Sequence, residues 1–545
     1  MKKIFSFIFF SLLTLISCRY YFHVGVPVTH DGDNHLVRFA NYKIAVRELQ
    51  FPPRLAPNLV NRYGYPVFNY NYPLANLISL PFSILNFHYE LTFKIIVSSF
   101  VFLAFVGANL FLKERGFKRN SRIFALFVFA LNPYIFTSII FRGNIGEVIA
   151  WGILPWVFYF LEKIKSSKII FEKNFFLLTI ALSALLLAHN ITAFFACIFI
   201  GFYLLFSYWK NWLDWKKFIF SFLWSFAISL WFWLPAIFEK NLIILDNVDL
   251  TLNYYKHFPT LIQLIRSTIY FGYSYWGSVD SMSFGLGALQ ISLFIAAIIY
   301  LLKNKAKKNT VFFIALFILF FGQLAISKPL YDLIPFADFI QFPWRLALLF
   351  SLFLLPISAL IFENANKYLK LFFIILVILQ INQFWKIKPI DYRHKNQIDY
   401  DVDAGTTSVN QENMPKSFSF AFYGERPDPI FISTGSGKIN VKNFFGSYRD
   451  YSLELKDKST IIESTAFFQG WETKANGKLL SYLDNDQIKG RIAYELEAGN
   501  YDIKTRFTQK TPSRLIGNVI SGIALLSLVI SIFSFWRKGR KSKKQ

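Results

Sequence analysis

The sequence is poor in cysteine and in charged residues for a chain of 545 residues. Its two cysteines, Cys18 and Cys197, cannot build a disulfide framework, and they leave a cysteine-based zinc site without enough ligands. Charged residues make up 17% of the chain, whereas soluble globular proteins carry about 25%. Together these shortages argue against disulfide-rich scaffolds, disordered proteins and soluble enzymes.

Apolar residues are abundant instead. Hydrophobic residues make up 54% of the chain and aromatic residues 20%. They come in runs of roughly 18 to 25 residues, the length of a helix that crosses a hydrocarbon core of about 30 Å. A soluble protein of this size has too little interior to bury so much apolar surface. The sequence therefore predicts a polytopic α-helical membrane protein.

The net charge of +25 is concentrated between the apolar runs and in the tail that follows Trp536. Lysine and arginine favour the cytoplasmic side of a membrane, so we expect both termini and the basic loop at 113–122 to be cytoplasmic. No basic groove with interleaved aromatic residues stands outside the apolar runs, so nucleic-acid binding is not expected. The expected location is the cell membrane, as a multi-pass protein.

Alternation of basic loops predicts about 12 membrane spans. The stretch 73–87 is short and broken by proline, so we expect it to be re-entrant or interfacial. Residues 15–18 resemble a lipoprotein cleavage box, but many spans follow, so the first helix is expected to be retained. The predicted spans lie at 4–20, 91–112, 122–140, 147–161, 174–189, 191–208, before 238, at 287–302, before 326, before 362, before 385, and at 516–536.

Three regions follow from this pattern. Residues 1–385 are expected to form the transmembrane domain with an external loop at 21–90, and residues 513–545 the final helix and a basic cytoplasmic tail. Between them, 386–512 should be an extracytoplasmic β-rich domain, β-sandwich-like, because apolar and polar residues alternate over 501–507. This domain could bind carbohydrate through exposed aromatic residues such as Trp471, or its role could be structural.

An acid-rich stretch follows the first predicted span directly. Residues 30–35 read His-Asp-Gly-Asp-Asn-His. Polar groups at the membrane surface are functional candidates, and two carboxylates with two imidazoles can hold a divalent cation or supply a general base. The alternative is a solvated turn that caps an interfacial helix, because Asp-Gly-Asp is also common in turns.

The next residues predict an amphipathic helix on the membrane surface. Over 34–47, apolar side chains such as Leu36 and Phe39 alternate at helical spacing with basic ones such as Arg38 and Lys43. We expect the basic side chains to face water.

Further polar clusters fall on the same expected side of the membrane. Arg142 and Arg345 could each grip a phosphate through two hydrogen bonds. Structural alternatives are an ion pair between helix ends, a snorkelling arginine, an interfacial aromatic belt and helix-end hydrogen bonding. The clusters are Arg54 with the aromatic loop 63–73 that contains Tyr72, Arg142 with Glu147, His189 with Asn190, and Trp344 with Arg345.

These motifs resemble a membrane protein family labelled as related to 6-pyruvoyl-tetrahydropterin synthase, although nothing in the chain suggests pterin chemistry. That family is grouped with the GT-C membrane glycosyltransferases. The resemblance implies a GT-C-like fold and transfer of a sugar from a polyprenyl-phosphate donor to an extracytoplasmic acceptor of the cell envelope. The similar residues are 30–35, Arg54, 64–66, 72–73, 142–143, Glu147, 189–190, 342–345, 470–471, 476–478 and 498–499.

By this resemblance Asp31 is the first candidate for the catalytic base, and Asp33 is its neighbour. Gly32 separates the two acids, whereas many GT-C members have adjacent acids here, so either one could be the equivalent residue. If a divalent metal takes part, its candidate ligands are Asp31, Asp33 and His35. The implied substrate-binding residues are His35, Arg54, Tyr72, Arg142, Glu147, His189, Asn190, Trp344 and Arg345.

The implied partners are the lipid bilayer, a polyprenyl-phosphate-linked sugar, and a glycan or protein acceptor. Two other classes of function remain open. A transporter or flippase for lipid-linked sugars would share the span count, but it favours broken helices, charges within the spans and internal repeats. A non-catalytic cell-envelope assembly protein would not need the acid-rich stretch.

Overall fold

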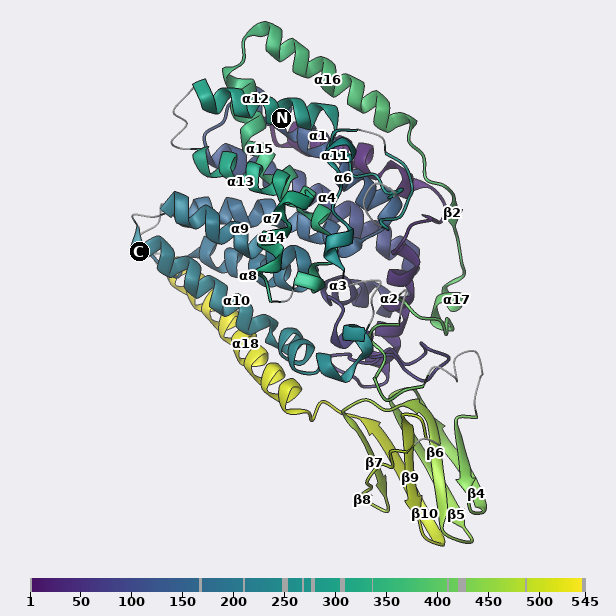
Figure 1. Ribbon diagram of the computed structural model, residues 1–545. Coiled ribbons are helices and arrows are strands. Elements are labelled where there is room, and N and C mark those ends of the chain that lie inside the picture. Colours follow the sequence, from purple (N-terminus) through teal and green to yellow (C-terminus); the bar gives the residue numbers. More distant parts are fainter. Residues whose placement is uncertain are drawn as a thin grey trace.

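Figure 1 shows the computed structural model as a bundle of helices, with a β region attached at one end. The structure describes residues 2–541 except 166–168, 209–210, 248–252, 267–268, 276–279, 304–308, 336, 409–410, 420–427 and 486–487. The final residues of the predicted basic tail, 542–545, lie outside the described residues.

Long apolar helices make up most of the bundle. Eight helical segments are long and apolar enough to cross a membrane, and two bent pairs raise the number to ten among the described residues. The main helices are α1 (Lys2–Cys18), α4 (Tyr89–Glu114), α5 (Arg119–Ala130), α7 (Ile145–Ile164), α8 (Lys173–Ala188), α9 (Asn190–Tyr208), α10 (Trp212–Phe238), α12 (Ala288–Lys303), α13 (Thr310–Phe321), α15 (Leu346–Asn364), α16 (Lys367–Lys386) and α18 (Pro512–Lys541).

A helix therefore occupies the position of each predicted span. The multi-pass helical prediction is confirmed, whereas the count of twelve stays a prediction because α8 and α12 have only 16 residues each. The stretch predicted not to cross forms the 11-residue helix α3 (Leu74–Ile84), which is too short to span a bilayer.

One break in the bundle matters for the site. The pair formed by α5 and the segment α6 (Pro133–Thr137) with η3 (Ser138–Arg142) bends by 44°. Proline has no amide hydrogen to continue a helix, and Asn132 restarts one by accepting the amide hydrogen bond of Ile135 at 3.2 Å. The second half of the span thus ends at Arg142, close to the start of α7.

The β region consists of two antiparallel sheets, ordered β4-β5-β10-β7-β8 and β3-β6-β9, which pack on a shared apolar core. The predicted strand at 501–507 is confirmed as part of β10, and the turn at 476–477 joins β7 and β8. The strands are β3 (Ile430–Thr434), β4 (Gly437–Phe444), β5 (Tyr448–Leu455), β6 (Ser459–Ala466), β7 (Trp471–Ala475), β8 (Lys478–Leu479), β9 (Arg491–Leu496) and β10 (Gly499–Phe507).

The suggestion that Trp471 binds carbohydrate as an exposed aromatic residue is wrong. Trp471 is 4% exposed, because its ring packs against Phe507 at 5.3 Å between centroids and against the guanidinium group of Arg449 at 4.7 Å. It belongs to an apolar cluster with Leu55 and Ile243, where the β region meets the helical bundle.

The segment between α16 and the β region, called here the crossing segment, runs back along one edge of the bundle beside α2 (Gly32–Arg47), as Figure 1 shows. Its strand β2 (Tyr392–Arg393) pairs with β1 (Val26–Pro27), and its short helix α17 (Gln397–Asp401) packs on α2. This crossing segment therefore packs against both β1 and α2.

The crossing segment also overturns the prediction that Arg38 and Lys43 face water. Arg38 is 7% exposed and donates a hydrogen bond to Thr407 at 3.0 Å. Lys43 is 4% exposed, donates to the hydroxyl of Tyr89 at 2.7 Å and pairs with Asp401. Helix α2 is formed as predicted, but most of it is buried, and of the basic residues Arg38, Lys43 and Arg47 only Arg47 is exposed.

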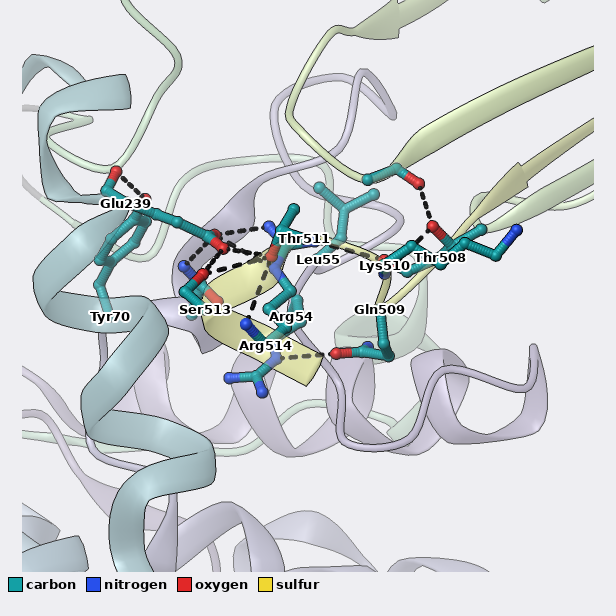
Figure 2. Close-up of polar contacts among 12 residues, drawn as sticks. Arg54, Leu55, Tyr70, Glu239, Thr508, Gln509, Lys510, Thr511, Ser513 and Arg514 are labelled. Carbon is teal, nitrogen blue, oxygen red and sulfur yellow. Dashed lines mark hydrogen bonds and ion pairs between the residues drawn. The ribbon is translucent and has the colours of Figure 1, made fainter. Parts of the chain in front are cut away.

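A buried carboxylate joins the β region to the bundle (Figure 2). Glu239, at the end of α10, accepts hydrogen bonds from Arg514 at 2.7 Å and from Thr511 at 2.7 Å, both at the start of α18. It also accepts one from Asn69 of the aromatic loop at 3.1 Å. Glu239 therefore holds α10, α18 and the aromatic loop together at the junction between the bundle and the β region.

Arg54 belongs to the same junction. It is fully buried and donates hydrogen bonds to the carbonyl oxygen of Trp231 at 2.6 Å and to the side chain of Gln509 at 3.2 Å (Figure 2 shows the latter). The structure thus places this predicted substrate-binding residue in the connection between bundle and β region.

Candidate functional site

Asp31 is held against the broken span by its backbone. Its amide donates a hydrogen bond to the carbonyl oxygen of Arg142 at 2.9 Å, and the amide of His30 donates to that of Phe141 at 3.0 Å. Asp31 is also the residue before α2, but its side chain does not cap that helix. Among the described residues the half-buried Asp31 carboxylate has neither a hydrogen bond nor an ion pair, so it is free to accept one.

A glycine makes this close approach possible. Gly143 has φ +62°, and a β-carbon there would clash with the hydroxyl oxygen of Thr29. That hydroxyl accepts the amide hydrogen bond of Gly32 at 3.0 Å, which shapes the turn around Asp31. A side chain at position 143 would push the acid-rich loop away from η3.

Glu147, in the first turn of α7, is the centre of a buried ion cluster. Its carboxylate accepts hydrogen bonds from Arg142 at 2.5 and 2.9 Å and from the hydroxyl of Tyr134 at 2.7 Å. The Nε atom of Arg345 lies 3.2 Å from the same carboxylate. Two neighbouring segments, α6–η3 and α7, and the distant start of α15 therefore converge on one side chain.

The cluster carries excess positive charge, because two guanidinium groups share one carboxylate. Asp31 lies within their electrostatic range. Burial raises the pKa of Asp31 above its ordinary value of 3.8, and the charges of Arg142, Arg38 and Arg345 offset this only in part. A raised pKa brings a carboxylate closer to the strength that a general base needs.

Aromatic and imidazole rings line the other side of the site. The hydroxyl of Tyr72 lies 3.4 Å from the Nε2 atom of His35 and donates to Asn144 at 3.3 Å. The His189 ring is 4.9 Å from that of Tyr72, and its Nε2 atom lies 3.9 Å from Glu147. Burial holds the pKa of His35 well below its ordinary value, so this ring is neutral.

A groove of about 610 Å³ opens beside the acid-rich loop. The end of α16 forms one wall with Leu379, Asn382 and Lys386, and Phe141 and Phe271 form the other. Its apolar floor and basic rim suit an amphiphilic ligand.

His30, the residue before Asp31, contacts a side chain of the groove wall. Its ring centroid lies 4.6 Å from that of Phe271 and is stacked at 4.4 Å on Tyr273. Burial lowers the pKa of His30 to about 4, so the imidazole is neutral at physiological pH. The residue before Asp31 therefore packs on a side chain that lines the groove.

The structure brings together most of the predicted site residues but not all. Asp31, His35, Tyr72, Arg142, Glu147, His189 and Arg345 converge, with the Trp344 ring 4.7 Å below the guanidinium group of Arg142. Asn190 instead donates to the carbonyl oxygen of Tyr70 at 3.2 Å. Asp33 pairs with Arg393 of β2, away from the ion cluster.

Two residues of the site were not predicted from the sequence. Tyr134 hydrogen-bonds Glu147, and Phe271 lines the groove next to His30. Each is an aromatic residue among many in the chain, so only its spatial position distinguishes it.

The three candidate metal ligands do not converge. Asp33 is engaged by Arg393 and His35 faces Tyr72, so neither side chain joins Asp31 at one point. Among the described residues there is no group of three or more histidine, cysteine, aspartate or glutamate side chains that could hold a metal ion. The donor set therefore does not fit a divalent metal, and no step is assigned to one.

Comparison with known families and structures gives one strong match. A family model described as the 6-pyruvoyl-tetrahydropterin synthase related domain, membrane protein, matches residues 68–390. No curated protein matches the chain.

Among solved structures, the cryo-EM structure of arabinofuranosyltransferase AftD from Mycobacteria has 17% sequence identity and a TM-score of 0.46. The match covers 69% of this chain and 26% of that one. A mutant of the same enzyme gives 15% identity and a TM-score of 0.48, and it covers 71% of this chain and 29% of that one. The chain thus spans less than a third of the length of these structures.

Proposed function

The chain belongs to the 6-pyruvoyl-tetrahydropterin synthase related family of membrane proteins, and we propose that it is a GT-C-like membrane glycosyltransferase. It would move a sugar from a polyprenyl-phosphate donor to an extracytoplasmic glycan or protein acceptor of the cell envelope. The observation that carries this proposal is the Asp31 carboxylate, which has no partner among the described residues and lies within electrostatic range of a buried cluster with excess positive charge.

In the proposed reaction Asp31 is the general base. An acceptor hydroxyl or amide loses its proton to the Asp31 carboxylate as its oxygen or nitrogen attacks the anomeric carbon. The bond between that carbon and the phosphate oxygen breaks, and the lipid phosphate leaves with the bonding electrons. A single displacement of this kind inverts the configuration at the anomeric carbon.

The contact to the phosphate is assigned to Arg345 rather than to Arg142. Both terminal nitrogens of Arg142 already donate to Glu147, so it cannot also grip a phosphate with two hydrogen bonds. Arg345 uses Nη1 for Gln341 at 3.1 Å, while its Nη2 atom has no hydrogen bond among the described residues. Arg142 would act from a distance, through a charge that stabilises the departing phosphate.

The groove between α16 and Phe271 is the proposed site for the lipid tail of the donor. Apolar side chains such as Leu379 suit the hydrocarbon. His30 and Phe271 would have to shift to admit the sugar to Asp31, since their rings now close that path.

The proposed topology places this chemistry outside the cytoplasm. The protein would lie in the cell membrane with both termini cytoplasmic, as a transmembrane domain at 1–385, a β-rich extracytoplasmic domain at 386–512, and a final helix with a basic tail at 513–545. In Figure 1 the β region lies at one end of the bundle, with the end of α10 and the start of α18.

A flippase for lipid-linked sugars is the second candidate, because two spans are broken. The pair that includes α5 bends by 44° and the pair that includes α13 by 102°, and broken helices are typical of transporters. The unpaired carboxylate and the small number of charges within the spans favour the transferase.

The test uses membranes that contain the protein together with polyprenyl-phosphate donors carrying a radiolabelled sugar. A transferase moves the label from the lipid fraction to a water-soluble or protein-bound acceptor. A flippase leaves the label on the lipid and changes only the leaflet in which it is found. A protein that does neither with any donor would refute both proposals.

A further inference from the structure

A second groove lies at the opposite end of the broken span from Arg142. It has a volume of about 730 Å³ and opens between the start of α5 and the start of α16. We propose that it binds an anionic phospholipid of the surrounding bilayer leaflet, with the lipid phosphate at its rim and a fatty chain along its floor. The proposal is independent of the glycosyl transfer proposed above.

The rim of the groove is basic. Lys118, Arg119 and Lys370 face one carboxylate, that of Glu363. Glu363 is already engaged, because it accepts the amide hydrogen bond of Lys118 at 3.1 Å and lies 4.0 Å from its ammonium group.

Arg119 and Lys370 have no carboxylate partner among the described residues. Arg119 lies 5.0 Å from the Phe5 ring centroid, and Lys370 lies 5.7 Å from that of Phe362. Rings hold these two cations in place without neutralising them. The rim therefore has two positive charges in excess, which favour an anion.

The start of α5 adds hydrogen-bond donors to the same rim. Lys118, the residue before this 12-residue helix, supplies no capping side chain. The amide groups of residues 119–121 have no acceptor among the described residues, and all three residues line the groove. Phosphate oxygens satisfy such amides, and they gain from the positive end of the helix dipole.

The floor of the groove is apolar and lies along the helices. Ile123 and Phe127 of α5 and Ile374 of α16 line it, and all three remain partly exposed. A soluble phosphate would leave this floor uncovered, whereas a phospholipid covers it with a chain that runs into the bilayer. Basic pockets between transmembrane helices bind anionic lipid headgroups in this manner.

Lipid retention by the purified protein tests the proposal. The detergent-solubilised chain is titrated with phosphatidylglycerol and, separately, with phosphatidylcholine, and native mass spectrometry measures the bound fraction. The parent protein should bind phosphatidylglycerol in preference. The double variant Arg119→Gln with Lys370→Gln should bind phosphatidylglycerol at least about tenfold more weakly than the parent does.

The matched control is Lys173→Gln with Lys216→Gln. It removes the same charge at the starts of α8 and α10, at the same end of the bundle but outside the groove. It should keep the affinity of the parent. Equal loss in both double variants, or equal binding of the two lipids by the parent, would overturn the proposal. If the groove variant does not purify, Lys370→Gln alone should show a smaller loss in the same direction.

Discussion

Glu147 accepts hydrogen bonds from both terminal nitrogens of Arg142, at 2.5 and 2.9 Å, and both side chains are buried. The carbonyl oxygen of Arg142 also holds the amide of Asp31. The ion pair and the proposed base are therefore parts of one unit, in which the pair fixes the backbone that positions the acid.

The first prediction concerns the stability of this unit. Glu147→Gln leaves Arg142 and Arg345 without their counter-charge in a buried site, which should lower the free energy of unfolding by about 3–5 kcal/mol. Denaturant unfolding of the purified protein in detergent measures the change.

The control for that loss is Glu472→Gln. Glu472 also pairs with a cation, Lys510 at 2.9 Å, but at the surface. Exposed ion pairs contribute about 0–1 kcal/mol, so this variant should unfold nearly as the parent does. Similar losses for the two variants would contradict the role assigned to Glu147.

The second prediction compares two glycines with positive φ. Gly116→Ala, at φ +88° and with open space where the added β-carbon would lie, should cost about 1–2 kcal/mol from backbone strain alone. Gly143→Ala adds a clash with Thr29 and should cost at least about 1 kcal/mol more. The sugar-transfer activity of Gly143→Ala should also fall, because the turn that holds Asp31 is displaced. Equal unfolding free energies would show that the contact with Thr29 is dispensable.

The third prediction concerns pH. A general base works only when deprotonated, and burial raises the pKa of Asp31, so transfer should fall on acidification with an apparent pKa above 3.8. The measurement is the rate of sugar transfer against pH in membranes. An acid limb at or below 3.8 would argue against Asp31 as the base.

The same shift carries a consequence for stability. Because the folded pKa of Asp31 lies above its unfolded value, the folded state binds the proton more tightly, and stability is lost as pH rises through the folded pKa. Asp31→Asn removes that loss, so at neutral pH it should unfold no more easily than the parent.

The fourth prediction compares Arg345 with an arginine at the surface. Arg345→Gln should raise the donor KM and lower kcat/KM by about tenfold to a hundredfold, the size of a lost hydrogen bond to a charged group. Arg506→Gln on the exposed face of β10 should change neither. An unchanged donor KM in Arg345→Gln would remove Arg345 from the phosphate contact.

The sequence predicted the helices and the strand β10, because these elements depend on the periodicity of nearby residues. The alternation over 501–507 predicted a strand, and it forms β10, while apolar runs predicted a helix at each proposed span. Arg142 and Glu147 are five residues apart across a turn between helices, so their pairing was among the alternatives that the sequence suggested.

The sequence did not predict the burial and ion pairing of side chains that are covered by distant parts of the chain. Arg38 and Lys43 have the spacing of a water-facing stripe, but Thr407 and Asp401, more than 350 residues later, cover them. Asp31 and Asp33 differ in their partners, because among the described residues Arg393 forms an ion pair with Asp33 and not with Asp31.

The most direct measurement compares sugar transfer by Asp31→Asn and Asp33→Asn in membranes with equal amounts of inserted protein. If Asp31 is the base, its variant should lose transfer by about a hundredfold or more, the contribution expected of general base catalysis. Asp33→Asn should stay within a few-fold of the parent, because Asp33 serves an ion pair outside the cluster. Full transfer by Asp31→Asn would contradict the account.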